Sequence, residues 1–108
     1  DLQTPTNQWT SAKGFDKALP LGPCIVTDID AGNLEISTTV NGQMKQHSNT
    51  RNLIFKPLQL VSYISSIMTL LPGDVIMTGT PSGISRLDSG DTVTISIEGI
   101  GELTNPVK

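Results

Sequence analysis

Apolar and polar positions alternate most strictly in one part of the chain. Apolar residues alternate with polar ones along residues 34–40, Asn41 and Gly42 follow, and a polar segment, residues 43–47, returns. Strict alternation is typical of a half-buried strand, and Asn-Gly between two such runs is typical of a type I′ turn. The pattern therefore predicts a β-hairpin over residues 34–47.

Further strands are predicted on both sides of this hairpin. Residues 92–97, which read Thr-Val-Thr-Ile-Ser-Ile, alternate strictly and predict a half-buried strand. Residues 102–105 predict a last short strand after a glycine-rich turn. Two short apolar runs bounded by turn residues, residues 24–27 and 75–77, predict two more strands, the second of them buried.

One segment follows the 3.6-residue period of a helix. It begins at Pro57, which suits the first helical position, and a stop signal follows at Pro72 and Gly73. Its apolar positions are Leu60, Val61, Ile64, Ile67, Met68 and Leu71. This predicts one amphipathic helix near residues 57–70, whereas Pro5 breaks any helix at the start of the chain. The fold class is therefore mainly β, with a mixed and mostly antiparallel sheet and a single helix.

Composition narrows the class of protein. The 108 residues suffice for one small domain, and the net charge of −3 without any Lys/Arg cluster argues against nucleic acid as a partner. No run approaches the roughly 20 apolar residues that a membrane span needs, so no membrane segment is expected. The single cysteine, Cys24, has no partner for an internal disulfide, which predicts a reducing, cytoplasmic setting.

Two places in the chain are candidates for chemistry. The predicted strand at residues 75–77 ends in Thr78, Gly79 and Thr80, and a rigid strand that ends in an open, hydroxyl-bearing loop can present donors to a small ligand. An ordinary strand and turn is the alternative. Lys13 lies among small residues between Trp9 and Phe15, a setting that suits a functional lysine, although a solvated surface lysine is the alternative.

Several motifs together resemble the fumarylacetoacetate hydrolase (FAH) family. They occur in the family's order along essentially the whole chain, and the long block from Pro-Gly-Asp to Thr-Pro-x-Gly is hard to produce by chance. The motifs are Trp9 with Ala12-Lys13-Gly14-Phe15-Asp16, Pro20-Leu21-Gly22-Pro23, Val40-Asn41-Gly42, Gln46-His47-Ser48-Asn49-Thr50, Leu53-Ile54-Phe55, Leu71-Pro72-Gly73-Asp74-Val75-Ile76, Thr78-Gly79-Thr80-Pro81-Ser82-Gly83, Gly90-Asp91 and Glu98-Gly99-Ile100-Gly101. The likeness is strongest to a bacterial branch with 2-hydroxyhepta-2,4-diene-1,7-dioate isomerases, 5-carboxymethyl-2-oxo-hex-3-ene-1,7-dioate decarboxylases and acylpyruvate hydrolases.

The resemblance implies a β-roll fold, a homodimer and a metal-dependent enzyme of aromatic-compound catabolism. Its substrate would be a small keto acid or β-dicarbonyl, which is hydrolysed, isomerised or decarboxylated through an enolate-like state with Mg²⁺ or another divalent cation such as Mn²⁺ or Ca²⁺. Lys13 would be the catalytic residue that stabilises the enolate and contacts substrate. Gln3 and Thr80 would contact substrate oxygens, with Thr78 and Gly79 completing the ligand-facing rim. We therefore expect Lys13 and Thr80 to converge on one cavity.

The resemblance also implies that something is missing. The family's metal carboxylates, a Glu-x-Glu pair and an Asp, precede the position that matches Asp1. Residues 1–108 are thus expected to form a single partial domain, the C-terminal part of an FAH-like catalytic domain, with no metal ligand of its own and inactive in isolation. Two alternatives come from other classes: a non-catalytic FAH-like β domain, and a small β-barrel carbohydrate module, against which the scarcity of aromatic residues argues.

Overall fold

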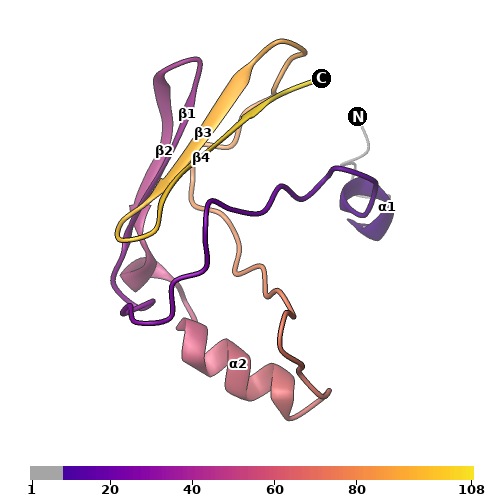
Figure 1. Ribbon diagram of the computed structural model, residues 1–108, viewed down its shortest axis with the longest axis vertical. Helices are drawn as coiled ribbons and strands as arrows, with labels where there is room; N and C mark the ends of the chain where they lie inside the picture. The colour runs from indigo at the N-terminus through magenta and orange to yellow at the C-terminus, as the bar shows by residue number, and fades with distance from the viewer. Residues whose placement is uncertain (1–8) are drawn as a thin grey trace.

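Within the part of the chain that the structure describes, four strands form one antiparallel sheet in the spatial order β2-β1-β3-β4 (Figure 1). The computed structural model describes residues 9–108. The strands are β1 (Glu35–Val40), β2 (Gln43–Asn49), β3 (Thr92–Ile97) and β4 (Gly101–Pro106). The central pair joins distant parts of the chain, because β1 lies antiparallel to β3 with Ile36 opposite Ile97 and Val40 opposite Val93. The prediction of a mainly antiparallel β fold is therefore confirmed.

The predicted hairpin is formed by β1 and β2. Asn41 and Gly42 have φ angles of 51° and 78°, and two positive φ angles are what a type I′ turn requires. The Asn41 side chain also joins this turn to β3, because its Nδ2 donates to Asp91 Oδ1 at 2.8 Å and its Oδ1 accepts from Thr92 N at 2.9 Å. The turn residue thus fixes the hairpin and its position on the sheet.

A β-bulge interrupts β2 at Lys45. Thr38 of β1 lies opposite Gln46 and the next residue, Thr39, lies opposite Met44, so Lys45 is the extra residue. Gly83 fits against this bulge, since a Cβ atom at Gly83 would lie 2.1 Å from the Lys45 carbonyl oxygen. Bulges redirect strands next to functional sites, and here the bulge lets the loop before Gly83 approach β2.

The predicted amphipathic helix is α2 (Pro57–Ser65), and it ends before residue 70. At its C-terminus the backbone N–H and the hydroxyl of Ser66 both donate to the Tyr63 carbonyl, at 3.2 and 2.7 Å. Bonds to the third residue back tighten the last turn, and they end the helix earlier than the apolar period suggests. A short helix, α1 (Trp9–Lys13), forms in addition to the single helix predicted; Pro5 precedes it in the sequence and so does not interrupt it.

Two of the predicted strands are wrong. Residues 24–27 and 75–77 form no ladder with any strand in the described part of the chain. Ile25 and Met77 are 94% and 71% exposed, so these apolar side chains are not buried as strand residues would be. A segment forms a strand only when a neighbouring strand hydrogen-bonds to it. The apolar pattern of a short run does not reveal whether such a neighbour is available.

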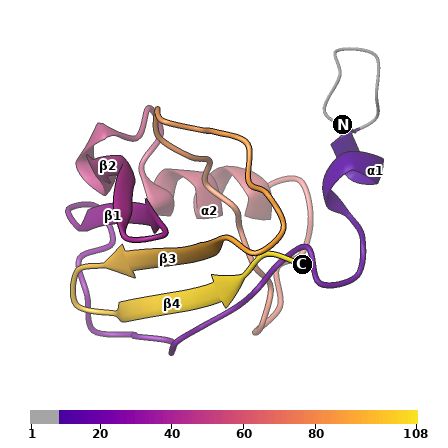
Figure 2. The ribbon, with the colours of Figure 1, turned by 90° about the horizontal axis from the view of Figure 1, so that it is seen from above.

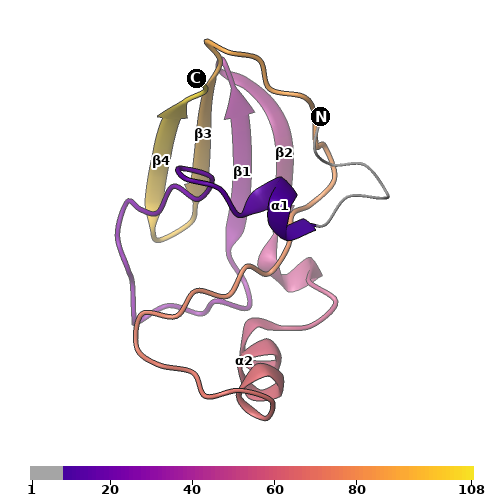
Figure 3. The ribbon, with the colours of Figure 1, turned by 90° about the vertical axis from the view of Figure 1, so that its right-hand side faces the viewer.

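Helix α2 and the long segment after it lie at different places around the sheet. Figure 1 places α2 beyond the end of the sheet where β2 ends, and residues 66–91 return from α2 to β3 along the side of the sheet (Figures 2 and 3). Leu34 and Val40, next to and within β1, are both buried at 8% exposure. Within residues 9–108, no helix has the length and apolar character needed to cross a membrane.

Candidate functional site

A cavity of about 430 Å³ lies between the sheet, the start of α2 and the loop that contains residues 78–81. Its apolar lining comes from β1, from α2 and the segment before it, and from Pro81 of the loop. Its polar lining consists of hydroxyl and amide groups. The lining residues are Ile36, Ser48, Asn49, Thr50, Asn52, Leu53, Ile54, Phe55, Leu60, Thr78, Gly79, Thr80 and Pro81. A mainly apolar cavity with a few polar groups is the usual character of a site for a small molecule.

The loop predicted to face ligand forms one side of this cavity. Thr78, Gly79 and Thr80 all line it, as does Pro81. Gly79 has a φ of 109°, a backbone conformation that side-chain-bearing residues rarely adopt, and the space beside its Cα is open. The structure therefore brings the three predicted rim residues together at a cavity wall, with the backbone accessible at Gly79.

Gln46 of β2 holds this loop in place. Its Nε2 donates to Thr80 Oγ1 at 2.9 Å and to the Pro81 carbonyl oxygen at 2.8 Å. Gly83 lies directly against the bulge residue Lys45, one position before Gln46. The rim is thus attached to the sheet by two hydrogen bonds and one close backbone contact.

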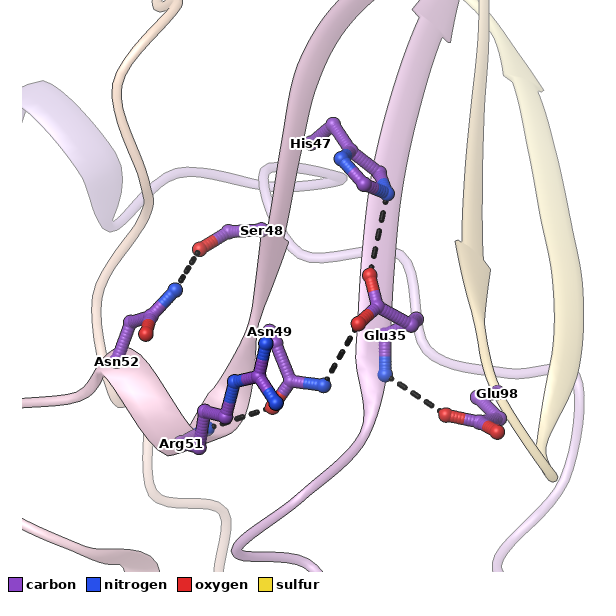
Figure 4. Close-up of polar contacts among 7 residues, drawn as sticks. All are labelled: Glu35, His47, Ser48, Asn49, Arg51, Asn52 and Glu98. Carbon is purple, nitrogen blue, oxygen red and sulfur yellow. Dashed lines mark hydrogen bonds and ion pairs between the residues drawn. The ribbon is translucent and has the colours of Figure 1, made fainter.

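Part of the cavity lining, at the end of β2 and just after it, is polar and held by hydrogen bonds. Asn49, which is 7% exposed, donates from Nδ2 to Glu35 Oε1 at 2.8 Å and accepts at Oδ1 from Arg51 N, also at 2.8 Å (Figure 4). Asn52 Nδ2 donates to Ser48 Oγ at 3.3 Å. These bonds fix the strand end and the 3₁₀ turn η1 (Thr50–Asn52) that follows it, which presents Thr50 and Asn52 to the cavity.

His47 of β2 contacts Glu35 of the neighbouring strand β1. Figure 4 shows His47 directed toward Glu35, whereas its neighbour Ser48 points the opposite way, toward Asn52. The His47 Nε2 to Glu35 Oε2 distance is 3.1 Å, and both side chains are about half exposed or more, at 64% and 49%. Glu35 N–H also donates to Glu98 Oε2 at 3.0 Å. The single histidine therefore contacts a glutamate at the surface and is not a lining residue of the cavity.

Of the other two predicted site residues, only Lys13 lies within the described part of the chain. Lys13 is the last residue of α1, its side chain is exposed, and it does not line the cavity. Figures 1 and 2 show α1 set off from the sheet and from α2. Gln3 lies outside the described residues. The convergence of Lys13 and Thr80 on one cavity therefore stays a prediction.

The described residues offer no ready metal site. Among residues 9–108, no group of three or more His, Cys, Asp or Glu side chains could hold a metal ion. The exposed Cys24 does not line the cavity, and its Sγ donates to the Ile100 carbonyl at 3.4 Å. The donor set that a divalent cation needs is thus not provided by this part of the chain.

Sequence reasoning missed part of the site. Gln46 and Asn49 occur within a motif that carries the family resemblance, but nothing in their spacing marks Gln46 as a partner of residues 80 and 81 or Asn49 as a lining residue of the cavity. The bulge at Lys45 changes which positions of β2 face the loop, and a bulge leaves no mark in the alternation of polar residues. The signal that could have found them is that Gln-His-Ser-Asn-Thr and Thr-Gly-Thr-Pro both belong to the set of motifs that carries the family resemblance.

Comparison with known proteins gives a consistent family. A family model described as fumarylacetoacetate (FAA) hydrolase C-terminal matches residues 1–108. An uncharacterised protein of Methanocaldococcus jannaschii is 56% identical over 108 residues, which are all of this chain and 46% of the relative. The mitochondrial oxaloacetate tautomerase Fahd2a of Rattus norvegicus is 42% identical over 110 residues, with 93% of this chain and 35% of its own length covered. The chain thus spans less than half the length of these relatives.

Comparison with solved structures points to the same family. The 2-hydroxyhepta-2,4-diene-1,7-dioate isomerase of Mycobacterium marinum is 57% identical and superposes with a TM-score of 0.90 over 93% of this chain and 40% of the isomerase. The maleylpyruvate hydrolase of Sphingobium sp. SYK-6, solved with manganese(II) and pyruvate, is 36% identical with a TM-score of 0.82 over 86% of this chain and 36% of the hydrolase. Isomerases, hydrolases and a tautomerase are therefore among the proteins that this chain is similar to.

Proposed function

This chain belongs to the fumarylacetoacetate hydrolase family, and on that basis we propose that it is part of an enzyme that acts on a small keto acid or β-dicarbonyl compound. The reaction is a C–C bond hydrolysis, an isomerisation or a decarboxylation, each of which passes through an enolate-like state. Relatives with hydrolase, isomerase and tautomerase names support this range of reactions. A place in the catabolism of aromatic compounds and a cytoplasmic location are part of the proposal.

One observation carries the proposal: Thr78, Gly79 and Thr80 line a cavity of about 430 Å³ next to an apolar wall. The threonine hydroxyls and the accessible backbone at Gly79 are suited to the oxygens of a carboxylate or carbonyl group, and the apolar wall is suited to the carbon skeleton. The size is that of a small-molecule site. We assign ligand recognition to this rim.

Lys13 is proposed to supply the positive charge that stabilises the enolate-like state. Gln3 is proposed to contact a substrate oxygen. The complete protein is proposed to depend on a divalent cation, Mg²⁺, Mn²⁺ or Ca²⁺, which is consistent with the manganese(II) in the related maleylpyruvate hydrolase structure. Because residues 9–108 do not bring together a set of ligands, we expect the cation to be held elsewhere in the complete protein.

Pyruvate binding to the isolated chain tests the proposal at the rim. Pyruvate is the probe because a related structure contains it. We expect pyruvate to shift the backbone amide NMR signals of residues 78–80, and Thr80→Val to weaken binding roughly tenfold, since it removes a hydrogen bond to a charged group. Thr27→Val is the control, because Thr27 is exposed and does not line the cavity.

Two results would contradict the proposal. Absence of any shift at residues 78–80 would favour the alternative of a non-catalytic β domain. An equal loss of affinity in Thr27→Val would show that the effect of Thr80→Val is not local. Calorimetry with Mn²⁺ tests the cation separately: we expect no tight, stoichiometric binding to the isolated chain, and such binding would overturn the placement of the metal ligands outside it.

A further inference from the structure

Gln46 makes its contacts to the rim through one atom. Its side-chain nitrogen Nε2 lies 2.8 Å from the Pro81 carbonyl oxygen and 2.9 Å from Thr80 Oγ1. A backbone carbonyl can accept a hydrogen bond but cannot donate one, so the group that faces Pro81 has to be the NH₂ of the amide. The orientation of the Gln46 amide therefore follows from the chemistry of its partner.

This orientation decides the direction of the bond to Thr80. An amide nitrogen has two hydrogens to donate and no lone pair available to accept, so Thr80 Oγ1 has to be the acceptor. The hydrogen of the Thr80 hydroxyl is then directed away from Gln46. Among the described residues, the structure gives this hydrogen no acceptor, and Thr80 lines the cavity.

We propose that Gln46 is a positioning residue that fixes the Thr80 hydroxyl as a hydrogen-bond donor toward a carboxylate or carbonyl oxygen of the bound ligand. The inference rests on the proposed function, which places such a ligand at the rim. Gln46 touches Thr80 and Pro81, does not line the cavity, and acts through Thr80. A threonine hydroxyl has one hydrogen to donate and two lone pairs; the bond from Gln46 uses one lone pair, so the hydrogen stays available to a ligand oxygen.

The backbone around Gln46 supports a fixed position. The bulge at Lys45 sets the direction in which Gln46 leaves β2, and Gly83 lies against the carbonyl of that bulge residue. Gln46 is itself half-buried between the strand and the loop. Because these backbone contacts fix both the strand and the loop, the Gln46 side chain loses little further conformational freedom when a ligand binds. This favours binding.

A double-mutant cycle with pyruvate as the probe tests the inference. Gln46→Glu replaces the donating amide by a carboxylate, which accepts the Thr80 hydrogen and so withdraws it from the ligand. We expect Gln46→Glu to weaken pyruvate binding tenfold or more when Thr80 is present. In the Thr80→Val background, the added negative charge still repels pyruvate, but the part of the effect that acts through Thr80 is lost, so the same substitution is expected to have a clearly smaller effect.

The comparison of the two backgrounds separates positioning from a general disturbance. An equal effect of Gln46→Glu with and without Thr80 would overturn the inference, because charge repulsion or loop disorder would then explain it. Gln43→Glu adds the same charge at an exposed position of the same strand, and we expect it to change the affinity by less than twofold. A Gln43→Glu effect as large as that of Gln46→Glu would likewise overturn the inference.

A measurement without ligand keeps the test independent of the proposed function. Three-bond NMR couplings are expected to show a single Thr80 side-chain rotamer in the unaltered chain and rotamer averaging in Gln46→Met, which removes both donated bonds. Averaging in the unaltered chain would overturn the inference. If pyruvate does not bind the unaltered chain while Thr80 is fixed, the proposed function fails, and the role of Gln46 toward a ligand fails with it, although the fixed rotamer remains.

Discussion

Asp91 is the residue whose ionisation is most clearly tied to the fold. The backbone N–H of Asp88 and the side-chain amide of Asn41 donate to its carboxylate, at 2.9 and 2.8 Å, and the charge of Lys45 adds to their effect. These interactions hold the pKa of Asp91 below its ordinary value of 3.8. Because the charged form is the one that is bound in the folded chain, Asp91 stabilises the fold above the pKa of the unfolded chain, and this contribution is lost as the pH falls through the lowered pKa.

Replacing Asp91 by Asn is therefore expected to lower stability at neutral pH and to reduce the loss of stability in acid. Urea unfolding measured between pH 7 and roughly pH 2.5 checks both effects. Asp28→Asn is the matched control, since Asp28 is an exposed aspartate that takes no part in these bonds. An Asp91→Asn chain that keeps the full acid dependence of the unaltered chain would contradict the assignment.

At the scale of single residues, the sequence predicts the ligand-facing threonines better than it predicts Gln46, which holds their loop in place. Thr78 and Thr80 stand in a motif whose hydroxyls and small residues suggest a ligand, and the cavity lining includes them. The role of Gln46 is not predictable in this way, because its partners Thr80 and Pro81 are more than thirty positions away in the chain, at separations of 34 and 35 residues. Long-range hydrogen bonds of this kind depend on tertiary structure, which local residue patterns do not encode.

At the scale of elements, the contact between the rim loop and β2 depends on one glycine. Gly83 has a φ of +99°, and a Cβ atom there would meet the carbonyl oxygen of Lys45 at 2.1 Å, its carbonyl carbon at 3.1 Å and Gln46 Cγ at 3.2 Å. Backbone atoms of a sheet strand do not move easily, so any side chain at this position displaces the loop. The loop and the strand are then no longer in register for the Gln46 bonds.

Gly83→Ala is expected to destabilise the chain by roughly 1–3 kcal/mol and to break the Gln46 contacts with the loop. Gly73→Ala is a close control, because Gly73 has nearly the same φ of +98° but no atom within 4 Å of the position that a Cβ would occupy. Thermal unfolding of both variants, with the Gln46 side-chain amide followed by NMR, separates the collision from the backbone strain. Equal losses of stability in the two variants would show that the contact with β2 contributes nothing.

The sequence predicts elements reliably where the signal is local. The Asn-Gly turn and the alternation around it specify the β1–β2 hairpin, and strict alternation specifies β3. The runs at residues 24–27 and 75–77 resemble strands in composition, but each would need a neighbouring strand that the described chain does not supply. Apolar content alone does not decide whether a segment is paired.

At the scale of the whole molecule, much apolar surface is uncovered. Leu58, Val61 and Tyr63 of α2 are 82%, 43% and 67% exposed, and Ile84 in the following segment is 79% exposed. Large exposed apolar areas are typical of surfaces that bind another protein. We propose, as the family resemblance implies, that the protein pairs as a homodimer, and that apolar residues of α2 take part in the pairing.

Leu58→Lys is expected to weaken self-association, because it places a charge at an apolar contact. Sedimentation equilibrium over a range of concentrations measures this, with the monomer mass of 11.5 kDa as the reference. Ser89→Lys adds the same charge in an exposed turn and is expected to leave the association unchanged. A chain that stays monomeric at all concentrations, or equal effects of the two variants, would contradict the proposed role of α2.

The pairing of β1 with β3 delays completion of the sheet during translation. β1 ends at Val40, but its second neighbour begins only at Thr92, so a ribosome that has synthesised the chain through β2 but not yet β3 holds a hairpin without its central partner. A lone two-stranded hairpin is at best marginally stable in water. Nascent chains therefore leave Ile36 and Val40 open to chaperones and proteases until β3 emerges.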